Sequence, residues 1–556
     1  MGSVSEQGTA ADRGCATNGK WARGQAVQIL SFIIVFAAGF GLRAYNLDKE
    51  SLWFDEAVSV SALDSATLSE FFAAERTYDP AMMPLYLLFE YFIAKWGGDS
   101  ILLLRWFSVL TAAGSMGVLY AFGRSLGGHF CGLTALIMLS FSKHHIWHSQ
   151  DIRMYSLYYF LAIMSSYVFF LALYRNKTWL WPVWIAANAA MLATHFFGCT
   201  LMLVQGIVLL SRLGIRHRLL YLLALGHLPV LLPFAWWVKG FSTSKMDIML
   251  SWIPLPTWQV LLESYLYVHS GALLFGNEET PHLKYNGGMI VGSVFALLLL
   301  HLMLMYAMRP KCKPWSTIRG KGVPSAGSNP DQGITVPAVG FLVLWFVLPT
   351  LVLYALSHAV RPCYVERYVL HSSYALFLLG AVSIVSFDRS LPRLGAIIAI
   401  LISSAYVLSD LRRPIRPDWK SVTDFIQSKY VQGDLVRIPE WYGGEFTLAS
   451  QHYHPNLPIE GVGIGFAEQA MVMASLGVTV WVPVIQQPPL DPERLKVELA
   501  GRNIPFDVQV FDGRKPITLF RINEERSYIL ENLSVITERG LVPLKPPPYR
   551  GKPTSK

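Results

Sequence analysis

Charged residues are scarce in this chain. Only 15% of its 556 residues are Asp, Glu, Lys or Arg, whereas soluble proteins average about 25%. Long apolar runs recur over the first three quarters of the sequence, which indicates a polytopic membrane protein. The formal net charge of +9 does not indicate a nucleic-acid partner, because the basic residues lie in short segments between apolar runs, where they orient a chain in the membrane.

Cysteine is also sparse, and its spacing argues against two kinds of site. The five cysteines are scattered, so neither a disulfide framework nor a zinc site is expected. The sequence has no Gly-rich nucleotide loop beside a strand and a helix. It also lacks a repeat between its halves and charges in the middle of its apolar runs, which are features that a transporter or flippase would show.

The apolar runs predict a mainly α protein with about 11 transmembrane helices. The expected spans lie at residues 25–44, 102–123, 130–146, 156–174, 179–197, 199–213, 219–238, 288–308, 334–357, 368–386 and 394–409. The basic segments then fall on one face, which is cytoplasmic by the positive-inside rule and holds an N-terminal tail at 1–24. An odd number of spans places the chain after residue 409 on the external side.

The C-terminal region changes character. Residues 410–542 are expected to form a small external α/β domain, and the Pro- and Lys-rich end at 543–556 is expected to be disordered. The elements expected in this domain are strands at 434–438, 478–482 and 517–522 and helices at 418–430 and 492–500.

Two of the expected external loops are long, at residues 45–101 and 239–287. Within the first loop, residues 84–93 are apolar but too few to cross a bilayer, so they are expected to lie in the interface as an amphipathic helix. Both loops belong to the membrane domain at 25–409.

The first loop also carries the octapeptide Ser51-Leu-Trp-Phe-Asp-Glu-Ala-Val58. Its acidic pair, Asp55 and Glu56, follows the first span within a few residues. Such a pair serves as a base or binds a cation. The alternative is a solvated loop whose Trp53 and Phe54 rest in the interfacial aromatic belt.

A short external link, residues 143–155, is dense in titratable groups. Its three histidines, His144, His145 and His148, suggest a metal site, but no carboxylate–His motif of a known metal site accompanies them. Arg153 better fits an anion, because a guanidinium offers a planar fork that suits phosphate.

Other polar residues are expected near the same face. Each arginine alone is most often an interfacial residue, but several arginines around one acidic pair fit an anionic substrate better. His195 is either a binding residue or a packed residue. The additional residues expected there are Arg105, His195, Arg361 and Arg367.

Several segments resemble, in order, the GT-C membrane glycosyltransferases, and most of all the bacterial branch near the protein O-mannosyltransferases and the aminoarabinose or galacturonic-acid transferases. The resemblance covers residues 25–440. The segments are Ser51-Leu-Trp-Phe-Asp-Glu, Pro84-Leu-Tyr, Leu104-Arg-Trp-Phe-Ser108, His145-Ile-Trp-His-Ser-Gln-Asp-Ile-Arg-Met-Tyr-Ser-Leu157, Thr194-His195-Phe, Glu366-Arg-Tyr-Val-Leu370 and Arg416-Pro-Asp-Trp-Lys420.

The chain departs from the family pattern at three positions. Asp151 stands where the family usually has Glu, His148 stands where it has Tyr, and a single proline, Pro84, replaces a double one. Asp for Glu keeps the charge but shortens the reach, which leaves the role of Asp151 open.

The resemblance implies an inverting transfer of a sugar from a polyprenyl-phosphate carrier to a lipid, glycan or protein acceptor. It implies that the reaction takes place on the periplasmic face of a bacterial inner membrane. An inverting transfer needs one base opposite the leaving group, and Asp55 is the candidate, with Glu56 and Asp151 orienting it or the acceptor. No cofactor is expected, since arginines neutralise a leaving monophosphate, although a divalent metal at Asp55 is an alternative.

Binding roles follow from the same resemblance and from the positions of the polar residues. The residues expected to bind the donor or acceptor are Arg153, Tyr155, Arg367, Arg361, Arg105, His195 and Trp53. Two other classes of function stay open from the sequence. They are a membrane transporter or flippase, and a non-enzymatic membrane scaffold with an external binding domain.

Overall fold

A computed structural model of the chain describes residues 8–78, 82–98, 100–239, 253–265, 288–308, 336–409, 416–462, 472–473, 478–485, 492–511 and 516–522. The chain divides into two compact units. The first unit comprises residues 1–49 and 58–412, and the second comprises residues 50–57 and 413–556. Most of the expected loop at 239–287 and the whole of the expected tail at 543–556 lie outside the described residues.

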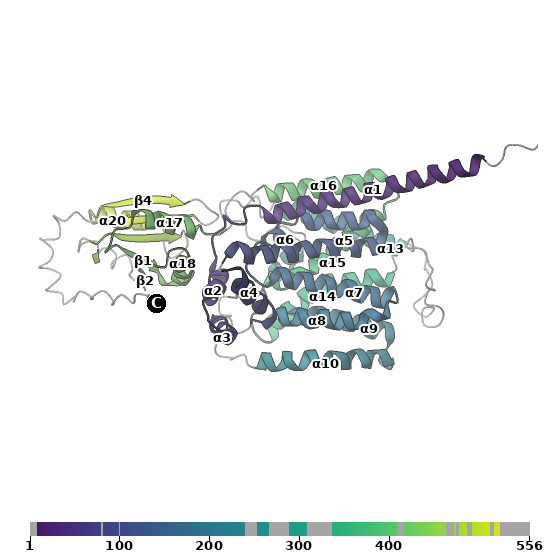
Figure 1. Cartoon of the computed structure of the whole chain (residues 1–556), viewed down its shortest axis with the longest axis horizontal. Coiled ribbons are helices and arrows are strands. Elements are labelled where there is room, and N and C mark those ends of the chain that lie inside the picture. Colours follow the sequence, from purple (N-terminus) through teal and green to yellow (C-terminus); the bar gives the residue numbers. More distant parts are fainter. Residues whose placement is uncertain are drawn as a thin grey trace, which may run out of the picture. The chain divides into compact units, whose positions relative to one another are not determined.

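The long helices of the first unit correspond to the expected spans and lie side by side, while the first part of α1 extends beyond the other helices (Figure 1). They are α1 (Gly8–Ala44), α5 (Ile101–Ser140), α7 (Tyr155–Tyr174), α8 (Trp181–Thr194), α9 (Gly198–Leu213), α10 (Arg218–Lys239), α13 (Gly288–Met308), α14 (Val336–Ala359), α15 (Ser373–Val385) and α16 (Ser390–Leu408). Helix α5 takes up two expected spans. It kinks at Gly127 and Gly128, and the φ of +78° at Gly128 is one that glycine adopts without steric cost.

Among the described residues, five helices are long and apolar enough to cross a membrane. Four shorter apolar helices accompany them, so the expected count of about 11 spans stays a prediction. Large apolar side chains on these helices are exposed, with Leu30 at 58%, Leu232 at 66% and Ile402 at 65%. Water-soluble surfaces rarely expose so much contiguous apolar area, and the chain is an integral membrane protein.

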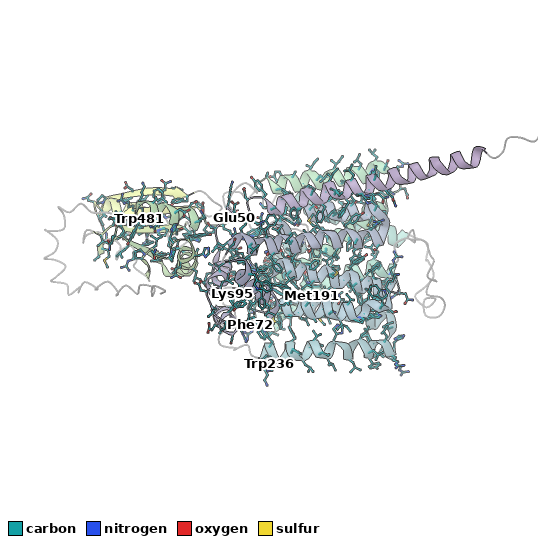
Figure 2. All side chains as sticks on the ribbon, viewed as in Figure 1. Glu50, Phe72, Lys95, Met191, Trp236 and Trp481 are labelled. Carbon is teal, nitrogen blue, oxygen red and sulfur yellow. The ribbon has the colours of Figure 1, made fainter. Side chains whose placement is uncertain are left out.

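Trp236 marks one end of a candidate span. It is the penultimate residue of the span from Arg218 to Trp237 and lies near the end of α10 (Figure 2). Its side chain is 74% exposed. Tryptophan at such a position is typical of the level of the lipid headgroups.

Shorter helices connect the long ones. They are α2 (Phe54–Ala62), α3 (Leu68–Tyr78), α4 (Pro84–Gly97), α6 (Lys143–His148), α12 (Trp258–Glu263) and the 3-10 turns η1 (Thr178–Leu180), η5 (Glu366–Tyr368) and η6 (Leu370–Ser372). Helix α4 forms where the sequence predicts an amphipathic helix, and Pro84 stands in its first turn, where its missing N–H is no loss.

The second unit contains a five-stranded sheet in the order β2-β1-β3-β5-β4. Its elements are α17 (Trp419–Lys429), β1 (Leu435–Pro439), α18 (Glu440–Tyr453), β2 (Ile459–Val462), β3 (Val480–Ile485), α20 (Pro492–Gly501), β4 (Phe506–Phe511) and β5 (Ile517–Ile522). Strand β1 is parallel to β2 and β3, whereas β5 is antiparallel to both β3 and β4. The three strands and two helices expected from the sequence are all present, while α18, β2 and β4 were not expected.

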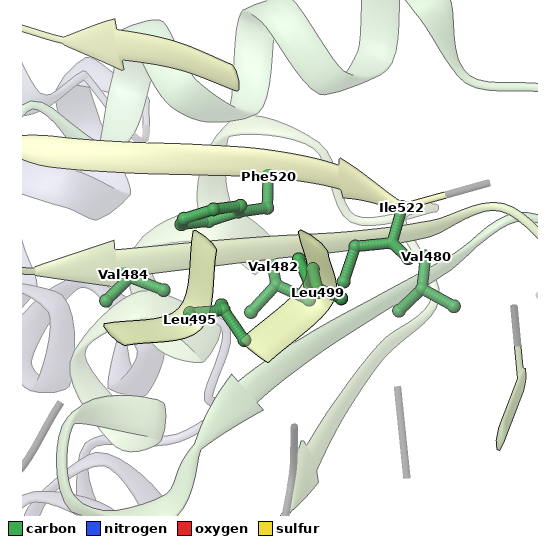
Figure 3. Packing of buried hydrophobic residues seen from close by; sticks show 7 residues of the cluster. All are labelled: Val480, Val482, Val484, Leu495, Leu499, Phe520 and Ile522. Carbon is green, nitrogen blue, oxygen red and sulfur yellow. The ribbon is translucent and has the colours of Figure 1, made fainter. Parts of the chain in front are cut away.

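The core of this sheet lies under α20. Leu495 and Leu499, one helical turn apart, pack against apolar side chains of β3 and β5 (Figure 3). Every residue of β3 is buried, because helices cover both faces of the strand. Leucines of α20 pack on Val480, Val482 and Val484, and Phe425 of α17 packs on Trp481. Trp481 of β3 donates a hydrogen bond from Nε1 to Oδ2 of Asp434 at 3.0 Å, which satisfies its only polar group.

Candidate functional site

The link between α6 and α7 is rigidly held in the first unit. Its residues from Asp151 to Tyr155 are all buried. Ser108 of α5 donates from Oγ to the backbone oxygen of Asp151 at 2.6 Å, and Ser156 of α7 donates to the backbone oxygen of His148 at 2.8 Å. Two helices therefore fix the backbone of a segment that carries several of the expected site residues.

His148 and Asp151 form a buried pair within this link. Nδ1 of His148 lies 3.0 Å from Oδ2 of Asp151, and the Asp151 side chain is fully buried. The ring of His148 lies 5.1 Å from that of Tyr155, measured between centroids. The sequence singled out Asp151 as a site residue, whereas His148 was named as a candidate metal ligand and as a departure from the family pattern.

Arg367 is anchored to α7 from the turn η5. Its Nε donates to the hydroxyl of Tyr155 at 2.8 Å, and the hydroxyl of Tyr159 donates to the backbone oxygen of Arg367 at 2.7 Å. The guanidinium carbon stands 5.6 Å from the centre of the Tyr155 ring, a cation–π contact. Tyrosines one turn apart on a helix thus hold an arginine from a segment more than 200 residues later.

His195 joins the same region from the end of α8. Its ring stacks on Tyr158 at 4.6 Å and lies 5.0 Å from the ring of Tyr368. Arg153 and Arg367 both act on it electrostatically. The first unit therefore brings together five of the residues named from the sequence, namely Asp151, Arg153, Tyr155, His195 and Arg367.

Arg105 and Arg361 interact with residues other than those of the cluster around Tyr155. Arg105 is buried, and its Nη1 donates to the backbone oxygen of Leu47 at 2.8 Å, just after α1. Arg361 is partly buried and acts electrostatically on Cys363.

Glu366 adds a second charge of opposite sign beside Arg367. Burial raises the pKa of the Glu366 carboxyl above its usual range, and the nearby Glu263 carboxylate raises it further. A backbone hydrogen bond and the attraction of Arg367 oppose the rise without cancelling it. Glu366 therefore keeps its proton to a higher pH than an ordinary glutamate does, because its pKa is raised.

The acidic pair of the octapeptide belongs to the second unit. Asp55 and Glu56 stand in the first turn of α2, where carboxylates interact favourably with the helix dipole. Glu56 is fully buried and forms an ion pair with Arg416, whereas Asp55 is partly exposed. Trp53 is half-buried.

Backbone and hydroxyl contacts secure the start of the octapeptide in the same unit. Ser51 donates from Oγ to Oδ1 of Asp418 at 3.1 Å and accepts from the backbone N–H of Lys420 at 3.0 Å. The backbone N–H of Leu52 donates to the hydroxyl of Tyr453 at 3.0 Å. In the sequence, the segment Arg416 to Lys420 contributed to the family resemblance but was given no role in the site. Tyr453 was not predicted as a site residue.

No metal site emerges from the described parts of the chain, in which no three His, Cys, Asp or Glu side chains gather as ligands. Two of the three histidines of α6 bond different partners, and the ring of His144 stacks on that of His148. His145 bonds Oγ of Ser373 at 2.6 Å, while His148 bonds Asp151.

No protein-family model matches the chain, and no curated protein matches it. The structure is similar to ArnT from Cupriavidus metallidurans in the apo state, with a TM-score of 0.48 and 10% identity, covering 91% of this chain and 98% of that one. For ArnT bound to undecaprenyl phosphate the TM-score is 0.46 at 11% identity, covering 90% and 98%. For the apo oligosaccharyltransferase of Archaeoglobus fulgidus it is 0.42 at 12% identity, covering 82% and 69%. Both proteins have the GT-C fold.

Proposed function

We propose that the chain is an inverting glycosyltransferase that moves a sugar from a polyprenyl-phosphate carrier to a lipid, glycan or protein acceptor. The observation that carries this proposal is a cluster in the first unit, in which Arg367 donates to the hydroxyl of Tyr155 and the ring of His195 lies 6.0 Å from that of Tyr155. Arg153 is buried in the same link, two residues before Tyr155. Two guanidinium groups among tyrosine rings, on a bundle of apolar helices, suit an anionic headgroup attached to a lipid tail.

The arginines neutralise the leaving phosphate in this proposal. As the bond between the anomeric carbon and the phosphate oxygen breaks, negative charge grows on the phosphate. Fixed cations stabilise that charge most strongly in a site that excludes water. Arg367 is preorganised for this role, because Tyr155 and Tyr159 fix both its side chain and its backbone.

Asp55 is proposed as the base that accepts the acceptor's proton. The sequence resemblance supports this role, and so does the partial exposure of its carboxylate, which leaves it reachable. Glu56 is engaged with Arg416, so its proposed part is to hold the turn that carries Asp55. Trp53 and the C-terminal sheet domain are proposed to shape the acceptor side without taking part in the chemistry.

The remaining binding residues are proposed around the donor. Tyr155 and His195 would border the phosphate, while Arg105 and Arg361 would contribute positive potential at the same face. The face is proposed to be periplasmic, in a bacterial inner membrane, with a cytoplasmic N-terminus. Reporter fusions at Ala326 and Lys545 should then give opposite signals, and equal signals would contradict this topology.

The test of the function is donor cleavage. Purified protein in detergent, given a polyprenyl-phosphate-linked sugar and a mixture of envelope acceptors, should release free polyprenyl phosphate. The protein should not turn over a nucleotide sugar that is supplied without lipid. Turnover of the nucleotide sugar, or no release from any lipid-linked sugar, would overturn the proposal.

A further inference from the structure

His148 carries a ring nitrogen that the protein does not occupy. Its Nδ1 is taken by Asp151, at 3.0 Å from Oδ2. Within the part of the chain that the structure describes, Nε2 has no hydrogen-bonding partner. The side chain keeps 10% of its surface exposed, so a ligand can reach the ring.

The pair is built to hold its geometry. Asp151 is fully buried and accepts the Nδ1 hydrogen bond, while serines of α5 and α7 clamp the backbone oxygens of both residues. A carboxylate behind an imidazole fixes the orientation of the ring. Such a support suits a group that transfers a proton more than it suits a packing residue.

His148 also borders the proposed phosphate site. Its ring lies 5.1 Å from that of Tyr155, whose hydroxyl accepts a hydrogen bond from Arg367. The other titratable groups that face the imidazole are Asp151, His144, with its ring at 5.9 Å, and Tyr159, with its ring at 6.0 Å. One tyrosine therefore links the imidazole to the guanidinium.

We propose that His148 is the general acid that protonates the departing carrier phosphate, and that Asp151 is its positioning residue. This inference rests on the proposed glycosyl transfer. The bond from the anomeric carbon to the phosphate oxygen breaks, and its electron pair stays on that oxygen.

The protons in this step balance. The phosphate oxygen takes the proton from Nε2 of His148, and the acceptor oxygen or nitrogen bonds to the anomeric carbon. The acceptor loses its own proton to Asp55. Solvent then carries one proton from Asp55 and returns one to His148, so the enzyme ends the cycle as it began.

The experiment separates proton transfer from simple hydrogen bonding. In His148→Gln the side chain keeps an N–H donor but cannot give up a proton, so kcat should fall roughly 100-fold or more while KM stays unchanged. His148→Phe should lower kcat and also raise KM. The solvent deuterium isotope effect on kcat should be smaller in His148→Gln than in the wild type.

His144→Gln is the matched control, because it removes an imidazole from the same short helix. It should retain the wild-type kcat. A wild-type kcat in His148→Gln, or an equal loss in both glutamine variants, would overturn the role of His148. Asp151→Asn should lower kcat with little change in KM, and a change in KM alone would contradict its positioning role.

A binding measurement keeps this inference distinct from the proposed function. The ³¹P resonance of polyprenyl phosphate bound to the full chain in detergent should differ between the wild type and both His148 variants. If the wild type cleaves no lipid-linked sugar, the transfer reaction itself is excluded. If instead turnover occurs but the ³¹P resonance and affinity are the same in all three proteins, His148 does not touch the phosphate.

Discussion

The carboxylate of Glu56 and the guanidinium of Arg416 form a buried ion pair although 360 positions separate them in the sequence. Arg416 also donates from Nη1 to the backbone oxygen of Ser51 at 3.2 Å. One arginine therefore fixes both the start of the octapeptide and the residue next to Asp55.

Removing either partner of this pair should destabilise the protein strongly. An unpaired buried charge costs about 3–5 kcal/mol, so Glu56→Gln and Arg416→Gln should each lower the free energy of unfolding of the second unit by an amount of this order. Denaturant unfolding of the full chain in detergent measures the change. The double variant should lose less than the sum of the single losses.

The exposed pair between Lys420 and Asp424 is the control for this prediction. Its nitrogen and oxygen lie 3.0 Å apart, and both side chains are 47% exposed. Lys420→Gln should therefore cost only about 0–1 kcal/mol. Equal losses at the buried and exposed pairs would mean that Arg416 contributes little.

Arginine-to-lysine exchange should separate charge from geometry in the donor site. Arg153→Lys and Arg367→Lys keep the positive charge but lose the planar fork. A hydrogen bond to a charged group contributes about 1.5–3 kcal/mol, so binding of polyprenyl phosphate should weaken roughly 10-fold or more. Isothermal titration in detergent gives the affinity.

Arg393→Lys serves as the comparison for these variants. The Arg393 side chain donates to the backbone oxygens of Phe387 and Val385 and has no proposed part in donor binding. Its lysine variant should bind polyprenyl phosphate like the wild type. Wild-type affinity in both Arg153→Lys and Arg367→Lys would show that these residues only anchor the helices.

Asp55→Asn should nearly abolish turnover. The substitution keeps the size of the side chain and removes its basicity, and loss of a general base typically costs roughly 100- to 10,000-fold in rate. The variant should still bind polyprenyl phosphate, because the arginines are unchanged. A rate near that of the wild type in correctly inserted protein would favour the scaffold hypothesis for the octapeptide.

The raised pKa of Glu366 predicts a pH-dependent stability. A carboxyl whose pKa is higher in the folded than in the unfolded state stabilises the fold below its unfolded pKa, and this contribution is lost as the pH rises through the folded pKa. The melting temperature should therefore fall as the pH rises above the pKa of an ordinary carboxyl group. Glu366→Gln should remove this dependence, and an unchanged pH profile in the variant would exclude Glu366 as its source.

Chelation should leave the reaction intact. The proposal assigns neutralisation of the phosphate to Arg153 and Arg367, so removal of divalent ions with EDTA should not lower the rate of donor cleavage. Restoration of a lost rate by Mg²⁺ or Mn²⁺ would instead support a metal at Asp55.

The long helices could be predicted from the sequence, because their apolar runs are long and their ends carry polar residues. The two spans expected at 102–123 and 130–146 are likewise separate helical runs within α5, divided by non-helical backbone at Gly127 and Gly128. Strand β4 was missed because it lies at the edge of the sheet, where most of its side chains are exposed and its pattern lacks a buried face.

The site could be predicted only in part, because residues that contact one another in the structure lie far apart in the sequence. The arginines indicated an anionic ligand, but nothing local in the sequence links Arg367 to Tyr155 or Glu56 to Arg416. These contacts arise from tertiary folding alone. His148 was named as a candidate metal ligand and as a departure from the family pattern but not as a partner of Asp151, because their pairing depends on the turn that follows α6.

The ion pair between Glu56 and Arg416 also has a consequence for the timing of biogenesis. Glu56 leaves the ribosome long before Arg416, and at usual elongation rates the interval of 360 residues lasts on the order of a minute. During that time Glu56 of the octapeptide lacks the ion pair with Arg416. A chain that ends before Arg416 therefore contains the acidic turn without the ion pair that holds it in place. Premature termination and late folding failure both leave the proposed base, Asp55, without its final position.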